Sequence, residues 1–202
     1  MNLTQRFTEA LIFAMNLHAK QIRKGTDIPY VSHLLAVASL VLEHGGNEDE
    51  AIAALLHDAI EDQAKHNGGA EALRQVIREK FGDNVVEIVD GCSDTSTHPK
   101  PPWRERKERY IAHIRVASSS MRLVSAADKL HNARAVLFDY RSLGEDIWSR
   151  FNAGKADQLW FYRELVKAFR DAGYSPLVEE LDRAVTVLER LANNARMPEA
   201  DV

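Results

Sequence analysis

The sequence predicts an all-α fold, and three observations lead to this prediction. Apolar residues recur at helical spacing along the chain, pairs of glycines and prolines interrupt these stretches, and no alternating apolar run indicates a strand. Of the 202 residues, 45% are hydrophobic and 28% are charged, which suffices for one core and excludes a collagenous or wholly disordered chain. We therefore expect a single domain over residues 1–202, with a folded part over about 4–192 and a frayed tail over 193–202.

The individual helices follow from the apolar spacing and from start and stop signals. A break over 25–29 separates the first two helices, Ser32 is expected to cap the second at its N-terminus, and the Gly45-Gly46 pair ends it. The third helix starts with acidic residues and contains the most regular apolar pattern. Pro176 suits the first position of the last helix. Helices are expected over residues 4–21, 33–44, 48–62, 71–81, 84–89, 103–116, 121–137, 153–172 and 176–192.

Charge and hydropathy exclude several classes of partner. The formal net charge of -4 argues against binding nucleic acid through bulk positive potential, although it leaves room for a basic pocket that takes a small anion. No stretch approaches the roughly 20 apolar residues of a membrane span, and the N-terminus lacks the apolar run of a signal peptide. We expect a cytoplasmic protein that binds neither nucleic acid nor a membrane. The oligomeric state is open, with a homodimer as one option.

Cys92 is the single cysteine, so no intrachain disulfide and no cysteine-rich zinc site can form. We interpret it as a packed helix residue.

Ionisable residues interrupt three otherwise apolar helices. A histidine lies at the start of the second helix, and four ionisable residues lie together at the end of the third. An aspartate follows a run of small residues near position 127. Residues four apart lie on one side of a helix, so the cluster presents imidazole beside carboxylate. Such a mixed nitrogen and oxygen set suits Mn, Fe or Zn better than Ca. The residues concerned are His33, His57, Asp58, Glu61, Asp62, Asp128 and Asn132.

The order His33, His57-Asp58, Asp128 resembles the H…HD…D signature of the HD phosphohydrolase superfamily. The Glu61-Asp62 pair narrows this resemblance to the hydrolase domain of RelA/SpoT-type proteins and the small alarmone hydrolases, which cleave (p)ppGpp. The similarity runs over about residues 11–162 and is strongest over 23–33, 53–62 and 127–132. It implies an HD-domain helical bundle with a metal site between its helices.

The resemblance also implies a role for each residue of the motifs. One divalent ion, with Mn²⁺ expected and Zn²⁺ or Fe²⁺ as alternatives, would be held by His33, His57, Asp58 and Asp128. Glu61 and Asp62 would orient the attacking water and handle its proton. A nucleotide substrate would contact Arg23, Lys24, Asn132 and Tyr162. The products would be pyrophosphate and a nucleoside 5′-di- or triphosphate.

Two other functions stay open at this point. One is a different HD nucleotidase or phosphatase acting on a dNTP, a nucleoside monophosphate or NADPH; the other is an alarmone sensor without turnover. Guanine and adenine alarmones are equally compatible with the motifs.

Several charged and aromatic residues receive structural interpretations. We expect Lys129 to form a salt bridge, the charged run 104–109 to be a solvated helix face and Trp160 to pack in the core. The remaining histidines, His131 and His18 among them, fit no metal-binding spacing. The loop after Asp94 is expected to be mobile.

Overall fold

The computed structural model describes residues 2–95 and 99–194. Its α-helices are α1 (Gln5–Leu17), α2 (Val31–Glu43), α3 (Glu48–Leu56), α4 (Ala70–Phe81), α5 (Asp83–Cys92), α6 (Trp103–Val116), α7 (Ser119–Leu143), α8 (Lys155–Asp171) and α9 (Pro176–Asn194). Short helical turns are η1 (Ala59–Gln63), η2 (Ala64–His66) and η3 (Gly144–Arg150). Within the described residues no strand occurs, apart from one isolated antiparallel bridge between Ile22 and Pro29. The predicted all-α class is confirmed. The single-domain interpretation stays a prediction.

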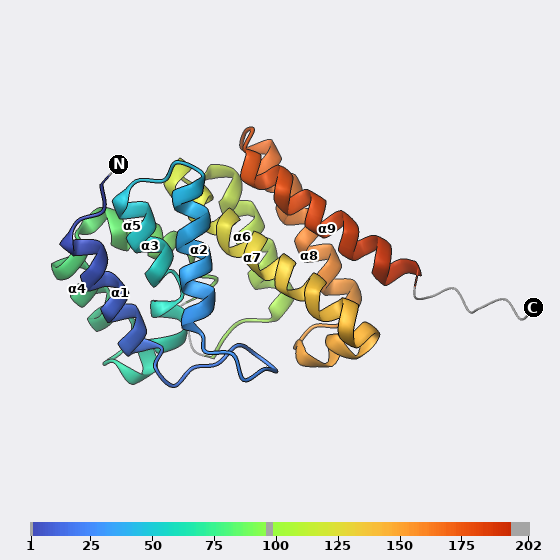
Figure 1. Cartoon of the computed structure of the whole chain (residues 1–202), viewed down its shortest axis with the longest axis horizontal. Coiled ribbons are helices and arrows are strands. Elements are labelled where there is room, and N and C mark those ends of the chain that lie inside the picture. The colour runs from blue at the N-terminus through green and yellow to red at the C-terminus, as the bar shows by residue number, and fades with distance from the viewer. Residues whose placement is uncertain (1, 96–98, 195–202) are drawn as a thin grey trace, which may run out of the picture.

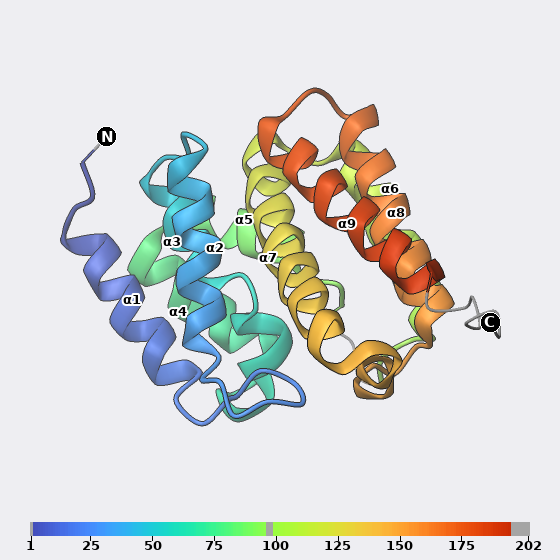
Figure 2. The same cartoon turned by 45° about the vertical axis from the view of Figure 1, so that its right-hand side comes forward.

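The longest helix, α7, lies in the middle of the molecule. It runs between α2 and α9 in Figures 1 and 2 and packs against both. Residues 124–128 are all buried, so this part of α7 is covered on every side. Two of them are alanines, and such small side chains let neighbouring helices approach closely. Polar side chains on this part of α7 therefore point into the interior.

α3 is equally enclosed. Residues 50–56 are all buried, and the helix packs against α1, α2, α5 and α7. A capping box at Asn47 and Glu50 fixes where it starts, because each side chain bonds the backbone N–H of the other. α2 and α3 both pack against α7, and the candidate site lies where the three helices meet.

The loop between α1 and α2 folds back on itself. The Arg23 N–H donates to the Ile28 carbonyl (2.8 Å), and the Tyr30 N–H donates to the Gln21 carbonyl (2.9 Å). Gly25 turns the chain with a φ of 73°, which favours glycine. This turn holds Arg23 and Lys24 at a fixed place beside α7.

The start of α2 differs from the prediction. The helix begins at Val31 with Tyr30 at its N-cap position, so Ser32 lies inside the helix and does not cap it. Tyr30 has helical backbone angles, and its hydroxyl donates to the Asp58 carboxylate (2.5 Å). A tertiary contact thus helps to set the start of this helix.

The predicted helix over 48–62 is wrong in its last part. α3 ends at Leu56, and η1 continues the chain as one π-helical turn. A π turn is wider than an α turn, and such turns occur often at functional sites. The residues of the polar cluster therefore do not share one regular α-helical face.

Other boundaries also differ. α1 ends at Leu17 and not at residue 21, and α5 extends to Cys92 and not only to residue 89. α7 extends six residues past the predicted end at 137, and η3 follows it in a segment for which we predicted no element. Residues 193 and 194 belong to α9 and are not frayed; the rest of the predicted tail, and residues 96–98 of the predicted mobile loop, lie outside the described residues.

Gly46, between α2 and α3, is expected to be intolerant of a side chain. A Cβ atom there would lie 2.4 Å from Val41 Cγ1 and 2.8 Å from the Val41 carbonyl oxygen. We expect Gly46→Ala to lower the free energy of unfolding by about 1–3 kcal/mol, as overpacking does, measured by urea denaturation. Gly154→Ala is the matched control, because no atom lies within 4 Å of its Cβ position. Equal stability of the two variants would contradict the prediction.

Candidate metal centre and adjoining cleft

Two histidines and two aspartates converge between α2, the end of α3 and α7. The Nε2 atoms of His33 and His57 are 3.3 Å apart. Asp58 Oδ2 lies 2.9 Å from His57 Nε2 and 3.6 Å from His33 Nε2. Asp128 Oδ1 lies 3.2 Å from His33 Nε2 and 3.7 Å from His57 Nε2. The structure therefore brings together all four residues predicted to hold a metal ion.

Hydrogen bonds at the far side of each imidazole orient this cluster. His57 Nδ1 donates to the Ala54 carbonyl (2.8 Å), which directs Nε2 inward. His33 Nδ1 lies 2.8 Å from His131 Nδ1. Metal-binding histidines commonly have such a partner on the second ring nitrogen, because it fixes the ring and its tautomer. Both histidines of the cluster are almost completely buried.

The charges of the cluster stabilise one another. Burial opposes a charge on His57, but Asp58 and Asp128 outweigh it and raise the pKa of His57 well above its usual 6.5. Burial also opposes the charge on Asp58, yet His57 and His33 hold its pKa well below the usual range. Burial opposes the charge on Asp128 too, but Lys129 and the two histidines hold its pKa well below the usual range. Both carboxylates are therefore ionised and ready to accept a cation.

The donor set fits a divalent transition metal. The ligand atoms of His33, His57 and Asp58 lie within 4.8 Å of one another, and Asp128 Oδ1 is close to both histidines. Two imidazole nitrogens and two carboxylate oxygens suit Mn, Fe or Zn, and these four side chains would hold such an ion.

Glu61 and Asp62 point to different partners, although they are adjacent in η1. Glu61 Oε1 accepts from Lys100 Nζ (2.8 Å), and its Oε2 accepts from the Asp94 N–H (3.2 Å). Asp62 Oδ2 accepts from Gln21 Nε2 (2.7 Å). Burial, with the nearby charge of Asp58, raises the pKa of Asp62 to about 6. Asp62 can therefore exchange a proton near neutral pH.

A cleft of about 580 Å³ adjoins the metal centre. All four predicted substrate-binding residues line it, and so does Asp62. Arg23 donates to Asn132 Oδ1 (2.8 Å), and Asn132 Nδ2 donates to Asp128 Oδ1 (2.5 Å). Hydrogen bonds thus link a cation in the cleft to a carboxylate of the metal centre. Among the described residues, neither Arg23 nor Lys24 has a carboxylate partner.

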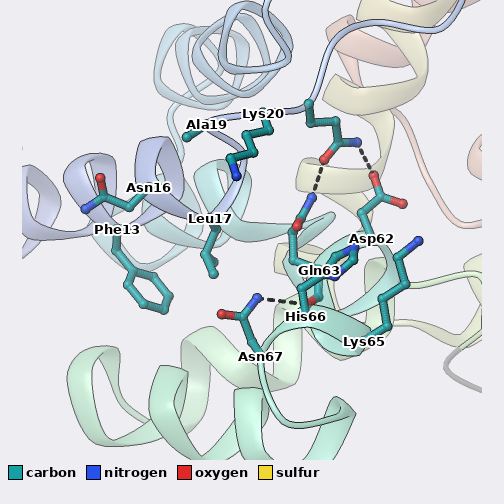
Figure 3. Close-up of a pocket in the computed structure, with 11 residues that line it drawn as sticks. Phe13, Asn16, Leu17, Ala19, Lys20, Asp62, Gln63, Lys65, His66 and Asn67 are labelled. Atoms are coloured by element: carbon teal, nitrogen blue, oxygen red, sulfur yellow. Dashed lines mark hydrogen bonds between the residues drawn. The ribbon is translucent and has the colours of Figure 1, made fainter.

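Asp62 also lines a larger cavity of about 980 Å³ (Figure 3). It is bounded by the end of α1 and by η1 and η2, and Asp62 and Gln63 line it. Neither Arg23 nor Lys24 lines this cavity. Both line the smaller cleft, together with Lys129 and Asn132, which donate to Asp128 of the metal centre. We therefore assign a substrate to the smaller cleft.

Sequence reasoning missed several residues of the site. His131 lies beside His33, and Tyr30 donates to Asp58; His18 and Gln21 are described below. The spacing of three from Asp128 to His131 is a signal that was available, because residues three apart share a helix face. Tyr30, in contrast, reaches Asp58 only through the tertiary structure.

Some structural interpretations are confirmed and others are wrong. Lys129 pairs with Asp128 (2.5 Å), as predicted, and Cys92 is buried. The run 104–109 is only partly a solvated face, because Arg106 and Lys107 are largely buried in ion pairs with Asp94.

Trp160 and Tyr162 of α8 lie in different surroundings. Tyr162 is buried and lines the cleft. Trp160 is only partly buried; the Arg104 guanidinium lies 3.2 Å from its ring centroid, and it does not line the cleft.

Comparison with known proteins identifies the family. The sequence model described as "HD domain" matches residues 10–159, most of the chain. The protein therefore belongs to the HD-domain family, for which a divalent metal ion is implied. The resemblance drawn from the order of His33, His57-Asp58 and Asp128 is confirmed.

Relatives of the chain include proteins named as (p)ppGpp hydrolases. The guanosine-3′,5′-bis(diphosphate) 3′-pyrophosphohydrolase MESH1 of Xenopus tropicalis is 34% identical over 165 residues, 80% of this chain and 83% of that protein. The bifunctional (p)ppGpp synthase/hydrolase SpoT of Escherichia coli K12 is 31% identical over 138 residues, 65% of this chain but 18% of SpoT.

A solved structure shows the same fold. It is of a metazoan SpoT ortholog described as hydrolysing ppGpp, and it superimposes with a TM-score of 0.74 over 95% of this chain and 99% of that one, at 23% identity. Among the described residues, no helix combines the length and apolar character needed to span a membrane.

Proposed function

We propose that this protein hydrolyses the 3′-diphosphate of an alarmone nucleotide, (p)ppGpp or its adenosine analogue, and releases pyrophosphate. One observation carries the proposal: the four-residue centre opens beside a cleft whose Arg23 and Lys24 have no carboxylate partner among the described residues. Two cations without anionic partners suit a substrate with several phosphates. The relatives named for this reaction support the same substrate class.

In the proposed reaction, His33, His57, Asp58 and Asp128 hold the divalent ion. When bound, the ion supplies Lewis-acid chemistry, which stabilises negative charge on phosphoryl oxygens and makes water more acidic. Lys129 and Asn132 each donate to Asp128 and keep its carboxylate oriented.

Asp62 takes the proton of the attacking water. The oxygen of this water forms a bond to the phosphorus attached to O3′ as the P–O3′ bond breaks, and O3′ receives a proton. Water addition to ppGpp then gives GDP and pyrophosphate. A pKa of about 6 suits Asp62 for proton transfer at neutral pH.

Arg23 and Lys24 hold the nucleotide. Arg23 carries a planar guanidinium that can both stack on a base and form paired bonds to phosphate, and it lies 5.9 Å from the ring centroid of Tyr30. Asn132 and Tyr162 complete the contacts on the α7 and α8 side of the cleft.

The products of hydrolysis test the proposal. Purified protein loaded with Mn²⁺, Zn²⁺ or Mg²⁺, or treated with chelator, is incubated with ppGpp, pppGpp, ppApp, dNTPs and NADPH. We expect GDP and pyrophosphate from ppGpp in equal amounts, measured separately from orthophosphate. Orthophosphate as the sole initial product would favour the nucleotidase or phosphatase alternative. Tight alarmone binding without turnover would favour a sensor.

Arg23→Ala is expected to weaken use of the alarmone without disturbing the metal centre. The loss of one charge-assisted contact should lower kcat/KM by roughly 10- to 100-fold, while metal content stays at the level of the parent. Arg109→Ala is the matched control, because Arg109 is exposed on α6 and, within the described part of the chain, pairs only with Glu105. An unchanged kcat/KM for Arg23→Ala would exclude Arg23 from substrate binding.

Several finer points of the proposal rest on the sequence alone, through its length, its charge and hydropathy, or the family resemblance. They are Mn²⁺ as the ion, the cytoplasm as the location, the absence of nucleic-acid and membrane partners, a possible homodimer and one domain over the folded part. Each stays a prediction.

A further inference from the structure

His18 is a buried polar residue that the proposed reaction does not use. It forms the C-cap of α1, and only 2% of its surface is exposed. Its Nε2 atom has no hydrogen-bond partner among the described residues. An imidazole buried in this way costs free energy unless its other contacts compensate, so those contacts indicate what it does.

The Nδ1 atom of His18 fixes the orientation of the Gln21 amide. It lies 2.7 Å from Gln21 Oε1, and because an amide oxygen only accepts, Nδ1 donates. Gln63 Nε2 donates to the same oxygen (2.5 Å). Two donors on Oε1 leave the amide nitrogen of Gln21 to face Asp62.

The Gln21 amide nitrogen then holds the Asp62 carboxylate. Its Nε2 donates to Asp62 Oδ2 over 2.7 Å; Figure 3 marks the hydrogen bonds of Asp62 and Gln63 with dashed lines. If the amide turned by 180°, its oxygen would meet this carboxylate and repel it. The donors on Oε1 therefore determine whether Gln21 attracts or repels Asp62.

The ring of His18 also supports Tyr30. The two rings stack with centroids 5.2 Å apart and planes 16° from parallel, and the Tyr30 hydroxyl donates to Asp58. Burial lowers the pKa of His18, so the ring is neutral at neutral pH.

We propose that His18 is a positioning residue for hydrolysis: its Nδ1–H orients Gln21, and Gln21 in turn holds Asp62 toward the cleft. This inference rests on the proposed function, because Asp62 acts there as the proton acceptor. His18 does not line the substrate cleft. Its side chain contacts Gln21 and Tyr30, and its Nδ1 atom also lies 3.5 Å from Gln63 Nε2, the second donor to Gln21 Oε1.

Two replacements of His18 separate its hydrogen bond from its ring. His18→Phe keeps an aromatic ring beside Tyr30 and removes the donor, whereas His18→Asn places an amide nitrogen where Nδ1 was. We expect His18→Phe to lower kcat for ppGpp roughly 10- to 100-fold, as small displacements of reacting groups do, with KM and metal content nearly unchanged. His18→Asn should recover most of the lost kcat. The proposal would be overturned if His18→Phe kept the parent kcat while His18→Asn lost it.

A double-mutant cycle with Gln21→Met tests whether the two residues act in series. Methionine has a similar length and no donor, so Gln21→Met should lower kcat at least as much as His18→Phe. The double variant should lose no more than Gln21→Met alone, because both changes remove one pathway. The proposal would be overturned if the fold-losses in kcat of the two single variants multiplied in the double variant, or if Gln21→Met had a normal kcat. The Gln21→Met result remains decisive if His18→Phe does not fold.

A second readout is independent of activity. In metal-free protein, the side-chain amide resonance of Gln21, identified by its loss in Gln21→Met, should shift in His18→Phe and return toward the parent position in His18→Asn. An unmoved resonance would overturn the positioning. Parent protein that hydrolyses no alarmone would instead contradict the proposed function, and the resonance would still decide the role of His18.

Discussion

Asp58→Ala is expected to abolish both metal binding and hydrolysis. Asp58 lies within 3.6 Å of both histidine Nε2 atoms, and its carboxylate is held ionised. Even the hydrogen-bond partners of metal ligands contribute about 10- to 100-fold in affinity or activity, so loss of a ligand should cost at least the upper end of this range. Elemental analysis after reconstitution with Mn²⁺ or Zn²⁺, together with the rate of pyrophosphate release, measures both effects.

Asp171→Ala is the matched control for this substitution. Asp171 is an exposed aspartate at the end of α8, where Arg115 is its one ion-pair partner among residues 2–95 and 99–194. Metal should raise the melting temperature of the parent and of this control, because an ion bound only by the folded state stabilises it. Equal metal content in Asp58→Ala and the parent would remove Asp58 from the coordination shell.

Asp62→Asn is expected to keep the metal ion and to lower kcat by about 100-fold or more, the contribution typical of a positioned acid or base. Asparagine has the same shape as aspartate and can still accept from Gln21, but it cannot take a proton. Burial and Asp58 raise the pKa of Asp62 to about 6, which is the property that the substitution removes. Single-turnover hydrolysis of ppGpp and the metal content are the two measurements.

Glu61→Gln should have a smaller effect than Asp62→Asn. Glu61 already accepts hydrogen bonds from Lys100 and from the Asp94 backbone, and unlike Asp62 it does not line the cleft. Turnover of Asp62→Asn within a few-fold of the parent would exclude Asp62 as the proton acceptor. Loss of metal in Asp62→Asn would instead place Asp62 among the ligands.

Some of the site was predictable because its signals are local. His57 and Asp58 are adjacent in sequence, and Asp128 and Asn132 are four apart on one helix, where Asn132 donates to Asp128. Polar residues inside apolar helices need partners, which is why the sequence already marked His33 and Asp128 as unusual. The order of these residues along the chain then indicated the family.

Other features depend on contacts between distant segments. By sequence, Arg106 and Lys107 look like solvated residues of a charged run. In the folded protein, the loop that contains Asp94 places its carboxylate beside both. The π turn over Ala59–Gln63 sends Glu61 toward Lys100 and Asp62 toward Gln21, a divergence that regular helical spacing does not predict.

The sequence by itself determined the helical class, most of the helices and the residues offered to a metal ion, since helical periodicity and motif order need no knowledge of distant neighbours. Only the tertiary structure decided how those residues are oriented. His18, Gln21 and His131 became part of the site because folding brings α1, η1, α2 and α7 together. A hydrogen bond over 2.7 Å depends on the position of both partners, and for residues 41 apart in the chain that position is set by packing, not by local spacing.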